Sequence, residues 1–392
     1  MRHATSAHGP FARLVFALAL ALAASAALRA QTEEWIHATP SAVVPHQLSV
    51  FTCDGVTSVN ARWLFSSSGY RVAQPSVVSR ASQTVTLDVR AEEYTGGILP
   101  AFFSFDKNFE LGVLEPGTYT LDVDSWGARL KEIQFTVRQT PPAAAPLDSG
   151  CFFVGQHYRD FLSREADGAG LAFWTNEIAS CGTDAACIEV KRINVSAAFF
   201  LSIEFRQTGG YVYNVYRAAL GRPPTLAEFA PDATFVGSRV VVGSDDPWAL
   251  RLSGNKDTFA QAFASRPEFV ARYNGLTTAQ YVDKLFETAG VTPTQAERDE
   301  LISSVDNCSF SIGCPTRATL LRRVAENPAV DRKLFNEAFV TMQYFGYLRR
   351  DPDPVGFNFW LKKLNDFNGN FVKAEMVKAF ISSDEYRHRF GN

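Results

Sequence analysis

The spacing of apolar residues changes at a short stretch rich in proline and alanine, and this change most limits the folds open to the chain. Before it, apolar and polar residues alternate, as at Val85, Leu87 and Val89, which is typical of strands with one buried face. After it, apolar residues recur at the spacing of one helix face, at positions 153, 154, 158, 161 and 162. The sequence therefore predicts an all-β part followed by an all-α part.

The chain of 392 residues is long enough for two or more domains. We predict an immunoglobulin-like β-sandwich over 31–139, a linker over 140–150 and a helical domain over 151–392. The segment Leu114–Leu121 has the pattern of a turn followed by a strand and resembles the tyrosine-corner region of such sandwiches. A small barrel is the alternative for the β part. Proline-rich linkers such as Thr140–Pro146 are extended, which places the domain boundary there.

The first 30 residues have the organisation of a secretory signal peptide. Arg2 and Arg13 are basic, and the apolar run Leu14–Ala24 is too short to span a membrane. Small residues allow cleavage after Ala26 or after Ala30. An uncleaved anchor is the alternative, and we predict no transmembrane segment after cleavage. We expect a secreted, periplasmic or cell-surface location.

Charge limits the partners that the mature chain can bind. Residues 1–30 contain three Arg and no acidic residue, so their removal takes the formal net charge from −3 to −6. A mildly acidic chain without a basic run is a poor partner for nucleic acid or for an anionic membrane surface.

Six cysteines follow the signal segment, and two pairs share one spacing. An even number of cysteines in an exported chain indicates disulfides, and the absence of nearby histidines argues against zinc. We predict two local disulfides and leave open a third bond between the remaining two cysteines, because six cysteines allow many connectivities. The local pairs are Cys181 with Cys187 and Cys308 with Cys314, and the open pair is Cys53 with Cys151.

The helical part contains segments that resemble one another. Phe153–Arg164 matches Phe339–Arg350, and a second run of matches follows without a gap: Asp167, Gly170 and Trp174 with Asp353, Gly356 and Trp360. A shorter match ends at Arg222, and three of the segments close on a Glu followed by an aromatic residue. We predict four stacked units at about 152–208, 210–274, 279–335 and 337–391.

The pattern Phe-Val-x-x-x-Tyr-x-x-Phe-Leu-x-Arg-x-x-Asp-x-x-Gly-x-x-Phe-Trp, with its closing Ser-x-Glu-Phe/Tyr-Arg, resembles the bacterial family called domain of unknown function 4214. The resemblance covers about residues 151–392. It is specific in the first and fourth units, moderate in the second and poor in the third, which lacks the Arg, the Gly and the Trp. It implies an all-helical domain of exported and cell-surface bacterial proteins, often beside adhesive or β-rich modules, and it implies no established activity.

The Arg-x-x-Asp motif has two interpretations. In the first, Arg164 and Arg350 each bind a carboxylate or a sugar acid of a ligand. In the second, which we favour, the motif shapes a helix end. Asp353 precedes Pro354, as an N-cap precedes a proline at the first helical position, and the Arg bonds the last carbonyls of the preceding helix.

Aromatic residues are the other candidates for ligand contact. Trp174 and Trp360 lie on a helix face beside Phe residues, so we expect them in the core. Trp126 lies at a predicted hairpin turn and is the best candidate for contact with a sugar ring. His157 lies on an apolar helix face and is expected to be a core residue.

We predict no catalytic, cofactor or metal site. The chain has no Gly-x-Ser-x-Gly, His-Glu-x-x-His or phosphate-loop motif. A calcium loop starting at Asp351 would need a carboxylate at Lys362. We therefore expect an exported binding or scaffold protein, with a glycan, an exopolysaccharide or another envelope protein as partner. The alternatives are an enzyme of unrecognised type acting on envelope polysaccharide, and a structural spacer or adhesin module.

Overall fold

The structure is a computed structural model that describes residues 34–73, 76–100, 102–244, 246–308 and 313–391. The signal peptide predicted at 1–30 lies outside the described residues. The chain divides into two compact units. Of the described residues, the first unit contains 34–47 and those of 61–106 and 118–135, and the second contains 48–60, 107–117 and those of 136–391.

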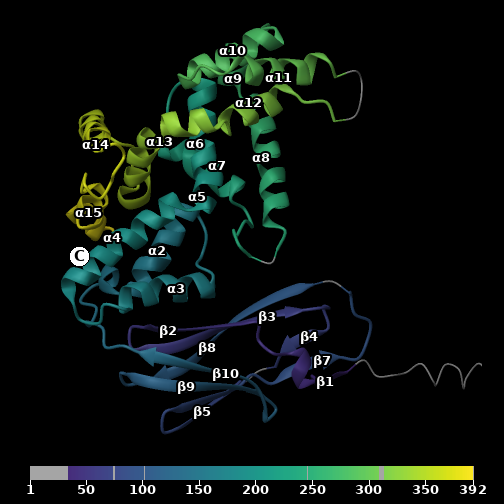
Figure 1. The fold of residues 1–392 in the computed structure, drawn as a ribbon, viewed down its shortest axis with the longest axis vertical. Coiled ribbons are helices and arrows are strands. Elements are labelled where there is room, and N and C mark those ends of the chain that lie inside the picture. Colours follow the sequence, from purple (N-terminus) through teal and green to yellow (C-terminus); the bar gives the residue numbers. More distant parts are fainter. Residues whose placement is uncertain (1–33, 74–75, 101, 245, 309–312, 392) are drawn as a thin grey trace, which may run out of the picture. The chain divides into compact units, whose positions relative to one another are not determined.

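The N-terminal part is built of strands, shown in purple to blue in Figure 1. The described strands form three sheets, with the orders β1-β7-β4, β10-β9-β6-β5 and β2-β3-β8. Their bounds are β1 Trp35–His37, β2 Gln47–Cys53, β3 Val56–Phe65, β4 Tyr70–Val72, β5 Val77–Ala81, β6 Thr84–Asp88, β7 Ala91–Tyr94, β8 Phe103–Val113, β9 Gly117–Ser125 and β10 Ala128–Val137. The prediction of an N-terminal β-sheet region is confirmed, and its finer assignment as an immunoglobulin-like sandwich stays a prediction.

The alternation seen in the sequence gives one buried sheet face. Strands β6 and β9 pair in parallel, with Val85 opposite Leu121 and Leu87 opposite Val123. All four side chains are fully buried. Because side chains alternate between the two faces of a strand, the intervening threonines and aspartates point away from this core.

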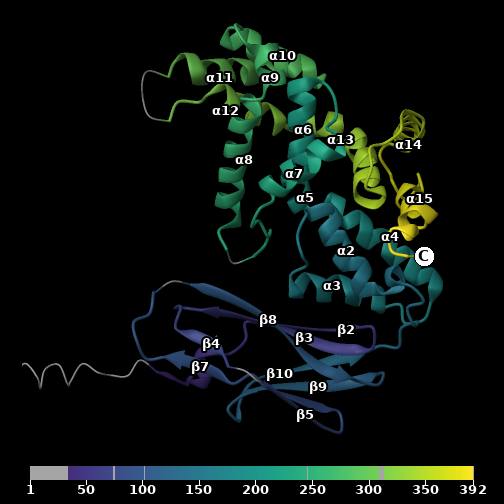
Figure 2. The ribbon, with the colours of Figure 1, turned by 180° about the vertical axis from the view of Figure 1, so that it is seen from behind.

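The C-terminal part is helical, coloured teal to yellow in Figures 1 and 2. The short 3-10 helix η2 Pro146–Asp148 precedes the α-helices, and η3 Tyr344–Leu348 is a π-helical turn; a second 3-10 helix, η1 Pro40–Ala42, lies between β1 and β2 in the N-terminal part. The α-helices are α2 Gly150–Leu162, α3 Gly168–Ala179, α4 Ala185–Leu201, α5 Ile203–Gln207, α6 Gly209–Leu220, α7 Leu226–Val236, α8 Trp248–Ala264, α9 Pro267–Tyr273, α10 Thr278–Ala289, α11 Gln295–Asp306, α12 Arg317–Ala325, α13 Pro328–Gln343, α14 Pro354–Asp366, α15 Met376–Ile381 and α16 Asp384–His388.

Helix α6 is the central element of the helical region. It contacts α5, α7, α9, α10, α12 and α13, and it lies among these helices in both views (Figures 1 and 2). Its Tyr211, Tyr213 and Tyr216 are almost completely buried. One continuous cluster of buried side chains runs from Leu147 to Tyr386, so the region shares one hydrophobic core.

The prediction of a helical C-terminal region is confirmed. Among the described residues, none of the helices has both the length and the apolar character needed to cross a membrane.

Candidate functional site

Four turns between helices share one backbone geometry. In each, the preceding helix ends on a residue in the left-handed conformation, and the residue four positions later caps the next helix by accepting the backbone N–H three residues further on. The left-handed residues are Ser163, Gly221, Gly290 and Arg349, and the caps are Asp167, Thr225, Thr294 and Asp353. Each turn therefore fixes both ends that it joins.

In three of these turns, the residue directly after the left-handed one is an arginine that binds a glutamate from a later segment of the chain. We call each of these arginine–glutamate pairs a brace. The Arg164 Nε and Nη2 atoms donate to the two carboxylate oxygens of Glu204 at 2.6 and 3.0 Å. Arg350 binds Glu385 in the same way, at 2.6 and 3.2 Å. Such two-pronged charged bonds are among the strongest polar contacts in proteins and fix a direction as well as a distance.

Arg222 forms the third brace, and its fork is shared between two carboxylates. It binds Glu268 at 2.9 and 3.4 Å and Glu228 at 2.8 and 2.9 Å. The two hydrogen-bonded carboxylates raise the pKa of its guanidinium, and the guanidinium in turn lowers the pKa of Glu228 to about 2. In the third turn along the chain, Val291 follows the left-handed Gly290, so the described structure has no equivalent brace there.

The remaining guanidinium nitrogen, Nη1, also has a hydrogen-bond acceptor in each of the three arginines. Nη1 donates to the carbonyl oxygen of the next residue: from Arg164 to Glu165 at 3.0 Å, from Arg222 to Pro223 at 3.2 Å and from Arg350 to Asp351 at 3.2 Å. The expected bond to the last carbonyls of the preceding helix is wrong, because the left-handed residue turns the chain and brings the following carbonyl into reach. A guanidinium with all three nitrogens committed is a poor receptor for a ligand carboxylate.

The Asp, Gly and Trp of the motif pack around a tyrosine hydroxyl. Asp167 accepts the backbone N–H of Gly170 at 2.7 Å. Burial raises the pKa of the Tyr158 hydroxyl, and the Trp174 side chain acts on that hydroxyl with a smaller, lowering effect on its pKa. A Cβ atom on Gly170 would overlap that hydroxyl, which explains why a glycine is needed. The guanidinium of Arg164 lies 4.8 Å from the centre of the Tyr158 ring, so the motif residues form one cluster.

The last of the four turns repeats this cluster with the same residue types. Asp353 accepts the N–H of Gly356 at 2.8 Å, and a Cβ atom on Gly356 would overlap the Tyr344 hydroxyl. Trp360 packs on Phe380, with 5.6 Å between ring centres. Both tryptophans are half-buried against the core of the helical region.

The second turn replaces the tryptophan by a carboxylate. Asp232 stands 16 residues after Tyr216, as Trp174 does after Tyr158, and it accepts the Tyr216 hydroxyl at 2.8 Å. Arg266 then binds both oxygens of Asp232 at 2.7 and 2.9 Å. The position keeps its contact with the tyrosine while the chemistry of the contact changes.

The glutamate partners of the arginines were not predicted from the sequence. Glu204, Glu268 and Glu385 belong to the closing segments, which are 35 to 46 residues away in the chain. Their recurrence in the sequence could have identified them, because each braced segment has one arginine near its start and one glutamate near its end.

Trp126 has its polar atom and one ring face engaged within the first compact unit. Its Nε1 donates to the carbonyl oxygen of Ala91 at 2.8 Å, and its ring stacks on His37 with 3.7 Å between ring centres. The guanidinium of Arg90 lies 5.5 Å from the ring centre. The side chain is 37% exposed, and its contact with a ligand stays a prediction.

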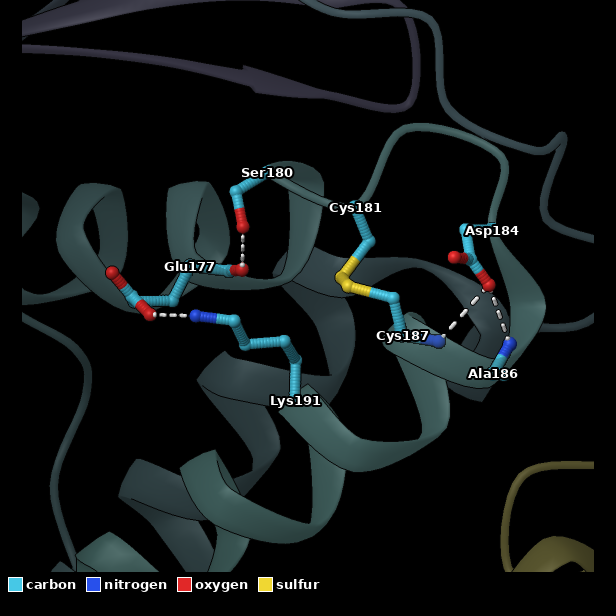
Figure 3. The surroundings of a disulfide bond; sticks show 7 residues. All are labelled: Glu177, Ser180, Cys181, Asp184, Ala186, Cys187 and Lys191. Atoms are coloured by element: carbon cyan, nitrogen blue, oxygen red, sulfur yellow. Dashed lines mark hydrogen bonds and ion pairs between the residues drawn. A yellow bond between two sulfur atoms is a disulfide. The ribbon is translucent and has the colours of Figure 1, made fainter.

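All six cysteines form disulfides, which confirms the two local pairs and also pairs Cys53 with Cys151. Figure 3 shows that Cys181–Cys187 joins the segment after α3 to the first turn of α4. The Asp184 carboxylate caps α4 by accepting the N–H groups of Ala186 and Cys187 at 3.0 and 3.1 Å. This disulfide therefore acts as a structural staple of the loop.

A buried histidine lies at the centre of the first helical segment. The His157 Nδ1 atom lies 2.7 Å from the carbonyl oxygen of Phe153, so Nδ1 carries the proton and Nε2 accepts the Ser196 hydroxyl at 2.8 Å. Ser196 in turn contacts the Tyr347 hydroxyl. Burial lowers the pKa of His157 to about 3, so the imidazole is neutral at physiological pH.

Within the described ranges, no three His, Cys, Asp or Glu residues are placed to hold a metal ion. The Asp351 carboxylate instead accepts the backbone N–H of Leu226 at 2.6 Å, at the start of α7.

We predict that the stability lost on removing a brace depends strongly on how deeply the ion pair is buried. The Glu204 side chain is 9% exposed and the Glu385 side chain is 48% exposed, although both bind an arginine in the same way. We expect Glu204→Gln to lower the free energy of unfolding by about 3 kcal/mol, because it leaves the partly buried Arg164 without a counter-charge. Glu385→Gln should lower it by about 1 kcal/mol or less, because water screens the exposed pair. Urea denaturation of both variants measures the difference, and equal losses would contradict this explanation.

We predict that the protein loses stability in acid because the buried His157 resists protonation. Its pKa is about 3 in the folded protein against an ordinary value of 6.5, so the unfolded chain binds a proton that the folded chain does not. The contribution of His157 is present above pH 6.5 and is lost as the pH falls. Between pH 6 and pH 4.5 we expect the parent to lose about 2 kcal/mol more stability than His157→Gln. Parallel pH curves for the two proteins would show that His157 titrates normally.

Comparison with known proteins identifies one region. Residues 327–390, from the start of α13 to the end of α16, match the model of a family described as a domain of unknown function, DUF4214. The match includes the brace of Arg350 and Glu385, and the wider resemblance over 151–392 stays a prediction. No curated protein and no solved structure matches the chain. The helical end of the chain is thus similar to domains of the DUF4214 family.

Proposed function

We propose that this protein is exported and acts as a binding and scaffold protein of the cell envelope or extracellular matrix, with a glycan or exopolysaccharide as its ligand. The signal-like organisation of residues 1–30 supports export. The three disulfides support the same compartment, because disulfides persist where the environment is oxidising.

The proposal includes a division of labour between the parts of the chain. Residues 31–139 form an immunoglobulin-like sandwich, residues 140–150 are a linker, and residues 151–392 are four stacked copies of one helical unit. The four turns with equal geometry support the copies, as do the three arginine–glutamate braces. Stacked units of this kind present the same surface position several times.

Two exposed aromatic side chains at matching positions carry the proposal. Phe173 on α3 and Phe359 on α14 each stand one residue before the tryptophan of their motif, and each is 57% exposed. Each ring meets the neighbouring tryptophan edge to face, with 4.8 Å between ring centres for Trp174 and 5.0 Å for Trp360. A single exposed apolar side chain is common on protein surfaces, but the recurrence of an exposed aromatic ring at equivalent positions of two segments favours a surface that contacts a ligand.

The chemistry of the exposed rings favours a sugar polymer. An aromatic face covers the apolar C–H face of a sugar ring, while water keeps access to the hydroxyl groups. Two equal contacts separated along the protein suit a ligand that itself repeats, because binding at the first site raises the effective concentration of the polymer at the second.

A purely structural role is the second candidate. It is favoured by the arginines of the braces, whose nitrogens are all engaged within the protein. In that role the helical region holds the β-sheet region as a spacer or adhesin module and binds no polymer.

A glycan array and a pull-down of envelope polysaccharide with the mature full-length protein test the proposal. We expect retention of at least one polysaccharide and a loss of affinity of about fivefold or more in the double variant Phe173→Ala with Phe359→Ala, given roughly 0.5–1.5 kcal/mol for each aromatic contact. The matched control removes two other exposed apolar side chains, Val355→Ala with Val190→Ala, which are 80% and 56% exposed.

Two outcomes separate the candidates. Retention that both double variants weaken equally would show that the aromatic positions have no special role. An absence of retention on every glycan would contradict the glycan proposal and leave the spacer as the function to pursue.

A further inference from the structure

A large cavity lies within the second compact unit. Its volume is about 980 Å³, which is in the range of pockets for small organic ligands, and all of its lining residues belong to that unit. Helices α2, α3, α4, α15 and α16 contribute to the lining, together with η2 and residues 52, 54 and 55. Much of the wall is apolar, with Leu147, Ile178, Ile188 and Ile381 among the lining side chains.

One cation in this wall has no carboxylate of its own. Arg192 on α4 donates to the carbonyl oxygen of Leu147, and its guanidinium lies 4.3 Å from the centre of the Phe153 ring. Burial lowers the pKa of Arg192. Among the described residues no carboxylate lies within ion-pair distance of it, although a half-buried guanidinium normally gains one.

The other charged groups around the cavity are largely matched. Arg387 lies 3.5 Å from Asp148, and Lys378 pairs with Glu189. Asp54 also lines the cavity, and it forms no ion pair with Arg192, Arg387 or Lys378 in the described structure. The charge at Arg192 is therefore the one that a bound anion would neutralise without breaking an existing pair.

Two buried hydroxyl groups of lining residues have no hydrogen-bond partner in the described structure. They are Thr175 Oγ1, on a residue that is 3% exposed, and the hydroxyl of Tyr386, which is fully buried. The Tyr386 hydroxyl is close enough to Arg192 for the two to interact electrostatically. An unsatisfied buried hydroxyl costs about 1–3 kcal/mol, and a bound acceptor would remove that cost.

We propose that this cavity binds a small amphipathic acid. The ionised acid group binds Arg192 and accepts a hydrogen bond from the Tyr386 hydroxyl. The apolar body of the ligand lies against the isoleucine and leucine side chains of the wall. Thr175 supplies a further donor. This site does not include the aromatic positions of the proposed glycan surface, so the two proposals are tested independently.

The Cys53–Cys151 disulfide supports the cavity covalently. Cys151 is a lining residue, and Cys53 lies between Thr52 and Asp54, which also line the cavity. A cavity whose rim is fixed before binding loses less conformational entropy when the ligand enters.

Decanoate and decan-1-ol are matched probes, because they share an apolar chain and differ at the acid group. Isothermal titration of the mature full-length protein should show one decanoate bound per chain, with decan-1-ol at least tenfold weaker. Arg192→Met, which keeps an unbranched apolar stem and removes the charge, should weaken decanoate at least tenfold and leave decan-1-ol unchanged. Arg323→Met on α12, outside the lining, is the control and should bind decanoate like the parent.

Tyr386→Phe is a second variant in case Arg192→Met does not fold. It removes only the unpartnered hydroxyl, and it should weaken decanoate several-fold while the protein stays folded. Equal binding of decanoate and decan-1-ol would overturn the proposal. Equal affinities for decanoate in the parent, Arg192→Met and Tyr386→Phe would overturn it as well.

Discussion

The packing of the helical region depends on one kind of contact, in which an arginine guanidinium donates to both oxygens of a glutamate and to the carbonyl oxygen of the next residue. It joins the turn after one helix to the short helix that closes the segment, as Arg164 does for Glu204 and Arg350 for Glu385. Hydrophobic burial supplies most of the driving force for packing, but it is not directional. The fork of the arginine adds the direction, because only one orientation of the closing helix lets both oxygens reach it.

The same contact explains why the motif residues occur together. The left-handed residue turns the chain, the Asp caps the next helix, and the Gly leaves room for the tyrosine hydroxyl beneath it. Changing one of these residues disturbs the others, since they share Tyr158 or Tyr344 as a common neighbour. The buried His157 adds a second fixed point, where a neutral imidazole links the Phe153 carbonyl to Ser196. These polar groups are engaged within the protein, and the exposed aromatic rings and the cavity beside Arg192 are the places where we propose that a ligand binds.

Local patterns in the sequence predicted much of this architecture, and long-range contacts were beyond them. Alternation at Val85 and Leu87 predicted strands, helical spacing from Phe153 predicted helices, and equal cysteine spacing predicted two disulfides, because each is a short-range property. The parallel pairing of β6 with β9 was not predicted, since strand order depends on contacts far apart in the chain. The glutamate partners of the arginines and the cavity around Arg192 were missed for the same reason: nothing in the neighbourhood of Arg192 in the sequence points to Leu147 or Tyr386.

Hydrogen exchange on the full-length protein, compared between the parent and Arg164→Ala, tests most directly whether the brace unites turn and closing helix. Glu204 binds Arg164 and also accepts the backbone N–H of Val242 at 3.2 Å. Without the arginine, the amides of α5 and of Val242 should exchange faster, while those of α16, braced by Arg350, should keep the rate of the parent. Unchanged exchange in α5, or equal acceleration in α5 and α16, would contradict the claim that the brace holds these elements together.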